Sequence, residues 1–186
     1  MNFLSQLIIF INIIFFIAQA NNHNLLIQSV FCPYYILESG QYSRMITHAF
    51  SHGSLTHFGI NMLVFAQLTN NVYFPYINLI KFFFHFFFIY NSLFMSISYI
   101  LATYFNYYEL FVSRSVGFSG VLFCLKYLLN MVDGNAIVNY NGINVTRKYL
   151  VFFELIFISI MVPNASFAGH LFGILTGMIM FQLGLA

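Results

Sequence analysis

Charged side chains are scarce in this sequence, and their scarcity excludes an ordinary water-soluble domain. Asp, Glu, Lys and Arg make up only 5% of the 186 residues, whereas a soluble domain carries about 25%. Six basic and four acidic side chains cannot cover the surface of a folded chain of this length. Lipid is therefore the expected environment, and the net charge of +2 is too small to indicate binding to nucleic acid.

Cysteine and proline are also rare. The two cysteines, Cys32 and Cys124, are too few for a disulfide framework, and Cys124 lies in an apolar run that favours a small packing residue. No stretch rich in glycine, serine or proline separates one part of the chain from another. We therefore expect residues 1–186 to form a single membrane domain.

Hydrophobic residues, in contrast, account for 61% of the chain. A transmembrane helix needs about 20 apolar residues, so this length accommodates about six spans. The predicted fold class is an all-α membrane protein with a bundle of six transmembrane helices. The apolar runs place the spans at about 3–20, 57–74, 77–103, 118–132, 149–162 and 169–185.

Turn and breaker residues mark the ends of several spans. They are Pro75, Asp133-Gly134-Asn135, Asn141-Gly142 and Pro163-Asn164. The last three spans are short for a full membrane crossing. This predicts that their ends lie below the bilayer surface, inside a protein cavity that water can enter.

The first apolar segment, residues 3–20, fits either a signal peptide or a retained span. Retention is favoured, because the other five spans alone would leave the two termini on opposite faces. With a cytoplasmic amino terminus, four basic side chains fall on the cytoplasmic side and two on the other, in agreement with the positive-inside rule. The four are Lys81, Lys126, Arg147 and Lys148, and the two are Arg44 and Arg114.

Four polar residues near the starts of spans share one side of the membrane. His57 and Asn61 stand four apart in the second span, so both point from one helical face. Ser119 begins the fourth span and His170 the sixth. Because the second, fourth and sixth spans run in the same direction, we expect these side chains to converge at one depth.

The residue types at this depth predict nucleophilic catalysis. A serine hydroxyl becomes a good nucleophile when a histidine takes its proton, so Ser119 and His170 are a candidate pair. The usual third member, a carboxylate that orients the histidine, is absent at this depth. The prediction is therefore a dyad, with His170 held by packing. Phe123, one helical turn after Ser119, is placed to stack on the imidazole.

Acyl transfer also requires donors for the developing oxyanion. The candidates are the backbone N–H of Ser119 at a helix start, the side-chain amide of Asn61 and the imidazole of His57. His52, in the loop before the second span, is either a further site residue or only a residue that orders the loop.

Glycines predict close contact between the fourth and sixth spans. Gly173 and Gly177 stand four apart on an apolar helix, where they permit close approach of a neighbour. Gly120 and Cys124 offer a matching narrow face. Close contact of these helices would bring His170 within hydrogen-bond reach of Ser119.

Three motifs together resemble the rhomboid intramembrane protease family, over residues 42–177. They are Gly117-x-Ser119-Gly120, His170-x-x-Gly173-x-x-x-Gly177 and His52-x-x-x-x-His57-x-x-x-Asn61. Tyr42-Ser43-Arg44 is similar to the aromatic–arginine element of the family's first loop, although the family often has an adjacent tryptophan. Residues 115–123 and 166–171 are most similar to the endoplasmic-reticulum subgroup, rhomboid-related protein 4.

The resemblance implies a six-helix core with a water-filled site that opens to the lumenal face. It implies transmembrane protein substrates that enter sideways from the bilayer, and no metal, nucleotide or other cofactor. It implies the endoplasmic reticulum, with the Golgi or plasma membrane as alternatives, and it gives no oligomeric state.

Three other functions stay open. One is a pseudoprotease of the same fold that binds membrane clients; keeping both Ser119 and His170 argues against it. Another is a small transporter or channel, which would favour polar residues through the membrane midplane. The third is a metal site of His52, His57 and His170, which lacks a nearby carboxylate.

Two ionisable residues lie inside predicted spans away from this group. His85 stands in a run of phenylalanines, where an interhelical hydrogen bond is the favoured interpretation. Glu154 lies in the fifth span, nearer its cytoplasmic end, where we expect a structural hydrogen bond or snorkelling rather than a proton-transfer role.

Overall fold

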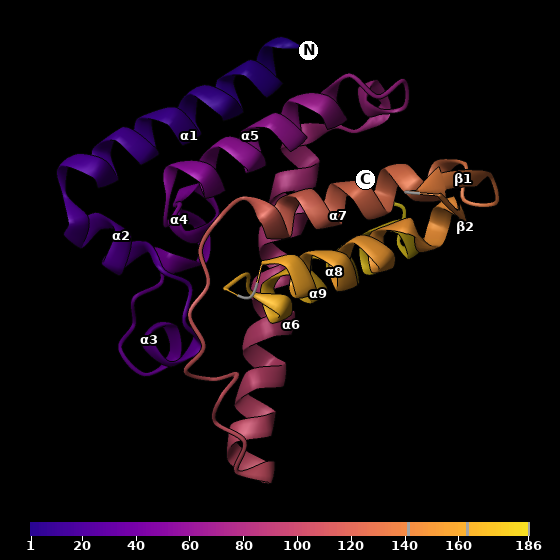
Figure 1. Cartoon of the computed structure of the whole chain (residues 1–186). Helices are drawn as coiled ribbons and strands as arrows, with labels where there is room; N and C mark the ends of the chain where they lie inside the picture. Colours follow the sequence, from indigo (N-terminus) through magenta and orange to yellow (C-terminus); the bar gives the residue numbers. More distant parts are fainter. Residues whose placement is uncertain (141, 163, 186) are drawn as a thin grey trace.

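The computed structural model describes residues 1–140, 142–162 and 164–185, which are mostly helical with one β-hairpin (Figure 1). The longer helices are α1 (Phe3–Asn21), α5 (Leu55–Thr69), α6 (Leu79–Phe105), α7 (Ser119–Val132), α8 (Leu150–Met161) and α9 (Phe167–Gln182). The short ones are α2 (His23–Ser29), α3 (Pro33–Leu37) and α4 (Arg44–Phe50), with 3₁₀ turns at Phe74–Tyr76 and Arg147–Tyr149. Strands β1 (Ile137–Tyr140) and β2 (Ile143–Thr146) pair antiparallel.

The long helices form two groups around α6. Helix α1 packs on α4 and α5, while α7, α8 and α9 contact one another on the other side (Figure 1). Helix α6 crosses between the groups and packs on α9. Fully buried phenylalanines fill the space between the groups, among them Phe31, Phe65, Phe86, Phe94 and Phe118.

Helices α7 and α9 make the most extensive contact of any two described elements, and glycines allow it. A Cβ atom added to Gly173 would overlap the backbone carbonyl of Gly120. A Cβ added to Gly177 would lie 3.0 Å from the carbonyl oxygen of Cys124. The two backbones therefore approach as closely as the glycine spacing predicts.

Side-chain caps fix where the helices that carry the histidines begin. Ser54 accepts a hydrogen bond from the backbone N–H of His57 at 3.1 Å, which starts α5. Ser166 accepts one from the N–H of Gly169 at 3.0 Å, which starts α9. Capping of this kind satisfies backbone donors that have no partner inside the helix. His57 and His170 therefore both lie in the first turns of their helices.

The stretch between the first two predicted spans, residues 21–56, is not a plain connection, because it folds into α2, α3 and α4. Phe31 explains much of that order. It is fully buried, and its backbone pairs with that of Ser115 through N–H to O distances of 2.9 and 3.1 Å. Residues between the first two predicted spans thus contribute to the core.

The largest difference between a predicted span boundary and a helix end is in α5. Helix α5 ends at Thr69 rather than near Phe74, because Asn70 caps it and the chain then turns through residues 74–76. The turn near Gly142 is the end of a β-hairpin that the hydrophobic pattern did not predict. Asn141 and Pro163, which we expected in turns, lie outside the described residues.

Two described helices, α1 and α6, are long and apolar enough to cross a membrane. Helices α7 and α9 are apolar but shorter. On α6 the side chains of Ile80, Phe84 and Phe88 are each more than two-thirds exposed. A contiguous row of exposed aromatic and aliphatic side chains suits contact with lipid, so composition and structure agree on a membrane protein.

Candidate active site

The starts of α7 and α9 bring Ser119 and His170 together. His170 Nε2 lies 2.9 Å from Ser119 Oγ, at hydrogen-bond distance. His170 is buried, whereas Ser119 is half-buried. When the hydroxyl donates in this contact, Nε2 is unprotonated and the ring proton sits on Nδ1. In that tautomer the imidazole has the form of a general base.

The Phe123 ring holds the imidazole of His170 from one side. The two ring centroids are 4.6 Å apart, and the planes are inclined by 30°. The Nδ1 atom of His170 is buried and has no hydrogen-bond partner among the described residues. Stacking, rather than a carboxylate, is thus the contact that orients this ring in the structure.

His57 and Asn61 lie against the residue two places before Ser119. A Cβ atom added to Gly117 would be 2.6 Å from His57 Nε2 and 3.7 Å from Asn61 Nδ2. Gly117 has φ +118°, a backbone conformation that favours glycine. Asn61 Nδ2 also donates to the carbonyl of His57 at 2.9 Å, which leaves its second hydrogen for another acceptor.

His52 contacts the residue immediately before Ser119. Its Nε2 accepts a long hydrogen bond from the backbone N–H of Phe118, at 3.4 Å. Burial, and to a smaller extent the neighbouring His57, lowers the pKa of His52 to about 3. The ring is therefore neutral at physiological pH and keeps Nε2 as an acceptor.

Two residues next to the site, His48 and Tyr90, were not among the residues predicted from the sequence. The carbonyl of His48 accepts the N–H of Gly117 at 2.9 Å, and its ring stacks on Tyr90. Tyr90 in turn lies against both Gly120 and Gly169. His48 stands one turn before His52, which was a usable signal, whereas nothing distinguishes Tyr90 from the other twelve tyrosines.

The loop before α4 is organised by Arg44. Its guanidinium is buried and donates to Gln41 Oε1 at 2.7 Å and to the carbonyls of Ile27 and Val30 at 2.8 and 2.7 Å. The aromatic ring beneath the guanidinium belongs to Tyr35, with Cζ 4.9 Å from the ring centroid.

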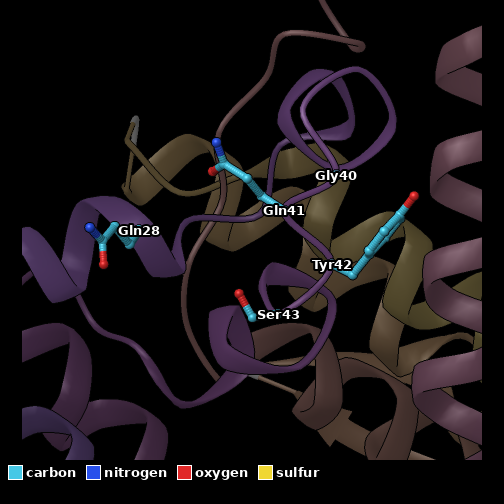
Figure 2. A pocket seen from close by; sticks show the side chains of 5 residues that line it. All are labelled: Gln28, Gly40, Gln41, Tyr42 and Ser43. Carbon is cyan, nitrogen blue, oxygen red and sulfur yellow. The ribbon is translucent and has the colours of Figure 1, made fainter.

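Tyr42 does not pair with this arginine. It is 65% exposed and lines a hollow of about 430 Å³ together with Gln28, Gly40, Gln41 and Ser43 (Figure 2). The expected aromatic–arginine element is therefore formed by Tyr35 from α3 and not by Tyr42. The hollow is lined by polar side chains of α2 and of the segment before α4, and none belongs to the Ser119–His170 group.

The two ionisable residues that we expected inside spans away from this group, Glu154 and His85, make structural contacts. Glu154 Oε2 pairs with Lys126 Nζ at 2.8 Å and joins α8 to α7. His85 Nδ1 lies 3.1 Å from the carbonyl of Leu185, just after α9. Both observations agree with the structural interpretation. In the described part of the chain no three His, Cys, Asp or Glu residues gather as metal ligands would.

Comparison with known families identifies the chain. The rhomboid domain family matches residues 39–186, from the α3–α4 connection to the end. The chain belongs to the rhomboid family. Rhomboid-like protein 14, mitochondrial, from Arabidopsis thaliana is 51% identical over 69 residues, which cover 37% of this chain and 20% of that protein. Rhomboid-related protein 4 from Homo sapiens is 46% identical over 70 residues, which cover 38% of this chain and 22% of that protein.

These relatives are much longer than their aligned segments. The chain matches only about a fifth of the length of each curated rhomboid. Rhomboid-related protein 4 from Mus musculus is likewise matched over a short segment, with 46% identity over 68 residues that cover 22% of its length. Family membership supports the helical fold and the membrane location, while the activity of this rhomboid has to be argued from its own residues.

Proposed function

We propose that this rhomboid is an intramembrane serine protease that hydrolyses peptide bonds of transmembrane proteins. The observation that carries the proposal is the 2.9 Å contact between Ser119 Oγ and His170 Nε2. A nucleophile and a base at hydrogen-bond distance are the minimum for covalent acyl transfer. We further propose that residues 1–186 form one domain in which α1, α5, α6, α7, α8 and α9 each cross the bilayer.

In the proposed reaction Ser119 Oγ attacks the carbonyl carbon of the substrate while His170 Nε2 takes the hydroxyl proton. The tetrahedral intermediate places its negative charge on the former carbonyl oxygen. The Ser119 N–H, the Asn61 amide and the His57 imidazole are the proposed donors to this oxyanion. The first intermediate collapses with transfer of the His170 proton to the leaving amine, which leaves an ester on Ser119.

Water completes the cycle. His170 Nε2 takes a proton from the attacking water, and the second tetrahedral intermediate releases a carboxylic acid as Ser119 recovers its proton. No carboxylate of the described residues contacts the imidazole, so in this proposal Phe123 supplies the orientation that an aspartate supplies in a triad. Gly117, Gly120, Gly173 and Gly177 allow the close backbone approach that this geometry needs.

The alternative function is a pseudoprotease that binds membrane proteins without cutting them. It has no use for a serine and a histidine at 2.9 Å, and this contact is the reason to favour the protease. For the compartment we propose the endoplasmic reticulum, with the Golgi and plasma membrane as alternatives. The name of the Arabidopsis thaliana relative adds mitochondria as a location to test.

The test is labelling of the detergent-solubilised protein with a fluorescent fluorophosphonate, which reacts with activated serines. We expect labelling of the wild type and none of Ser119→Ala or His170→Ala. Thermal melts show whether each variant is folded. A well-folded wild type that does not label would refute the protease and favour the pseudoprotease.

A further inference from the structure

Helix α1 carries three buried polar side chains at intervals of seven residues: Ser5, Asn12 and Gln19. Seven residues are about two helical turns, so the three side chains share one face of the helix. This is the face that packs on α4 and α5, where Phe16 stacks on Phe58 at 4.6 Å. Buried polar groups in an apolar helix are costly unless they are hydrogen-bonded. Each of the three side chains therefore needs a hydrogen-bond partner.

Two of the three find partners within or just before α1. Ser5 Oγ donates to Asn2 Oδ1 at 2.8 Å, and Asn12 Nδ2 donates to the carbonyl of Ile8 at 2.9 Å. Gln19 differs. Its Oε1 accepts the backbone N–H of His52 at 3.2 Å, in the connection between α4 and α5. Of the three, Gln19 is the one whose described hydrogen bond reaches another element.

The hydrogen bond of Gln19 to His52 is connected to Ser119 through one further hydrogen bond. His52, whose backbone Gln19 holds, accepts the N–H of Phe118 with its side chain, and Ser119 follows Phe118. At the other end of the same segment, the His48 carbonyl accepts the N–H of Gly117. The segment 48–52 therefore positions residues 117–118, and Gln19 fixes its carboxyl-terminal end from outside.

We propose that Gln19 is a positioning residue of the Ser119–His170 site and that α1 thereby contributes to the geometry of that site. The inference rests on the proposed protease function. Helix α1 lies outside residues 39–186, which the rhomboid family matches, so the contribution is not a property of the matched domain. It also requires that α1 stays attached after synthesis, because its removal as a signal peptide would remove the acceptor for His52.

The experiment compares Gln19→Met with Asn12→Leu in the full chain. Methionine keeps the length of glutamine without its acceptor, and Asn12 is a buried polar residue of the same face that has no described contact with the site. We expect the rate constant of fluorophosphonate labelling to fall about tenfold in Gln19→Met, the size of one net hydrogen bond. Asn12→Leu should stay within about twofold of wild type. Gln19→Glu, which restores an oxygen acceptor, should recover most of the rate.

Melting curves show whether a variant loses labelling only because it unfolds. Hydrogen exchange tests the contact between Gln19 and His52 even if the protease proposal fails. Labelling of Gln19→Met at the wild-type rate, or an equal fall in Asn12→Leu, would overturn the inference. If the wild type itself does not label, the protease proposal fails, and amide exchange of the peptide covering residues 48–58 decides the contact. Faster exchange in Gln19→Met than in Asn12→Leu would support it, and equal exchange would overturn it.

Discussion

Gly117 leaves no room for a side chain beside the candidate site. Its φ of +118° and the His57 ring 2.6 Å from its added Cβ both exclude a side chain. Any larger residue must displace either His57 or the backbone that leads to Ser119. Glycine is therefore required here for two independent reasons.

Replacing Gly117 by alanine should lower the fluorophosphonate labelling rate at least about a hundredfold, since small misplacements at a reacting centre cost that much. Gly142→Ala is the matched control. Gly142 also has a positive φ, +87°, but an added Cβ there has no atom of another described residue within 4 Å. Its variant should lose some stability in a thermal melt and keep the labelling rate. Equal labelling by the two variants would contradict the steric argument.

Phe123 is the second residue with a specific role, because its ring is the described contact that orients His170. Phe123→Leu should reduce the labelling rate about threefold to tenfold, the value of one aromatic pair. Phe123→Tyr should keep it. The control is Phe172→Leu, which removes a ring whose centroid lies 4.3 Å from that of Phe94, with the planes tilted by 31°. That variant should lower the melting temperature with little effect on labelling, and an equal loss of labelling would refute the orienting role of Phe123.

At the scale of elements, the α7–α9 contact decides whether Ser119 and His170 meet. Gly173 abuts the Gly120 backbone, so a methyl group there must push the helices apart. We expect Gly173→Ala to reduce stability by about 1–3 kcal/mol, as overpacking does, and to abolish labelling. Thermal melts and labelling measure the two effects.

Gly59→Ala on α5 is the control for this helix contact, because an added Cβ there meets nothing within 4 Å. Alanine is a better helix former than glycine, so this variant should be as stable as wild type or more stable. Full labelling by a Gly173→Ala protein would show that close contact of α7 and α9 is not needed to form the pair.

At the scale of the whole molecule, the number of membrane crossings remains a prediction. Only two described helices, α1 and α6, are long and apolar enough by themselves. Of the shorter helices, α5 packs on α1 and α9 packs on α6, while α7 and α8 pack on α9. The bundle, rather than each helix alone, therefore has to match the bilayer. Six crossings place the connections alternately on the two faces.

Single cysteines test these crossings in sealed microsomes with a membrane-impermeant maleimide. Val72→Cys and Ile143→Cys, on predicted cytoplasmic connections, should react without detergent. Tyr108→Cys should react only after permeabilisation. The three side chains are 73%, 60% and 55% exposed, and the natural cysteines Cys32 and Cys124 are buried, so background labelling should be low. Reaction of Tyr108→Cys together with Val72→Cys and Ile143→Cys in sealed vesicles would rule out the six-span arrangement.

Much of the architecture can be predicted from the sequence, because hydropathy and helical period are local properties. Each predicted span overlaps a helix, and residues 119 and 170 fall at helix starts. The fold of residues 21–56 could not be predicted in this way. There Phe31 is buried, packs on Phe94 of α6 and pairs with Ser115, and no local pattern contains these contacts.

Local patterns in the chain are enough to predict that this rhomboid is an apolar, helical membrane protein with polar residues gathered near the starts of three helices. Hydropathy and helical period can be read from short stretches of residues. Which side chains meet depends on helix packing: Tyr35 rather than Tyr42 lies beneath Arg44, and Gln19 holds the backbone of His52. Such contacts join residues distant in the chain, and their geometry depends on how helices pack rather than on where each helix begins.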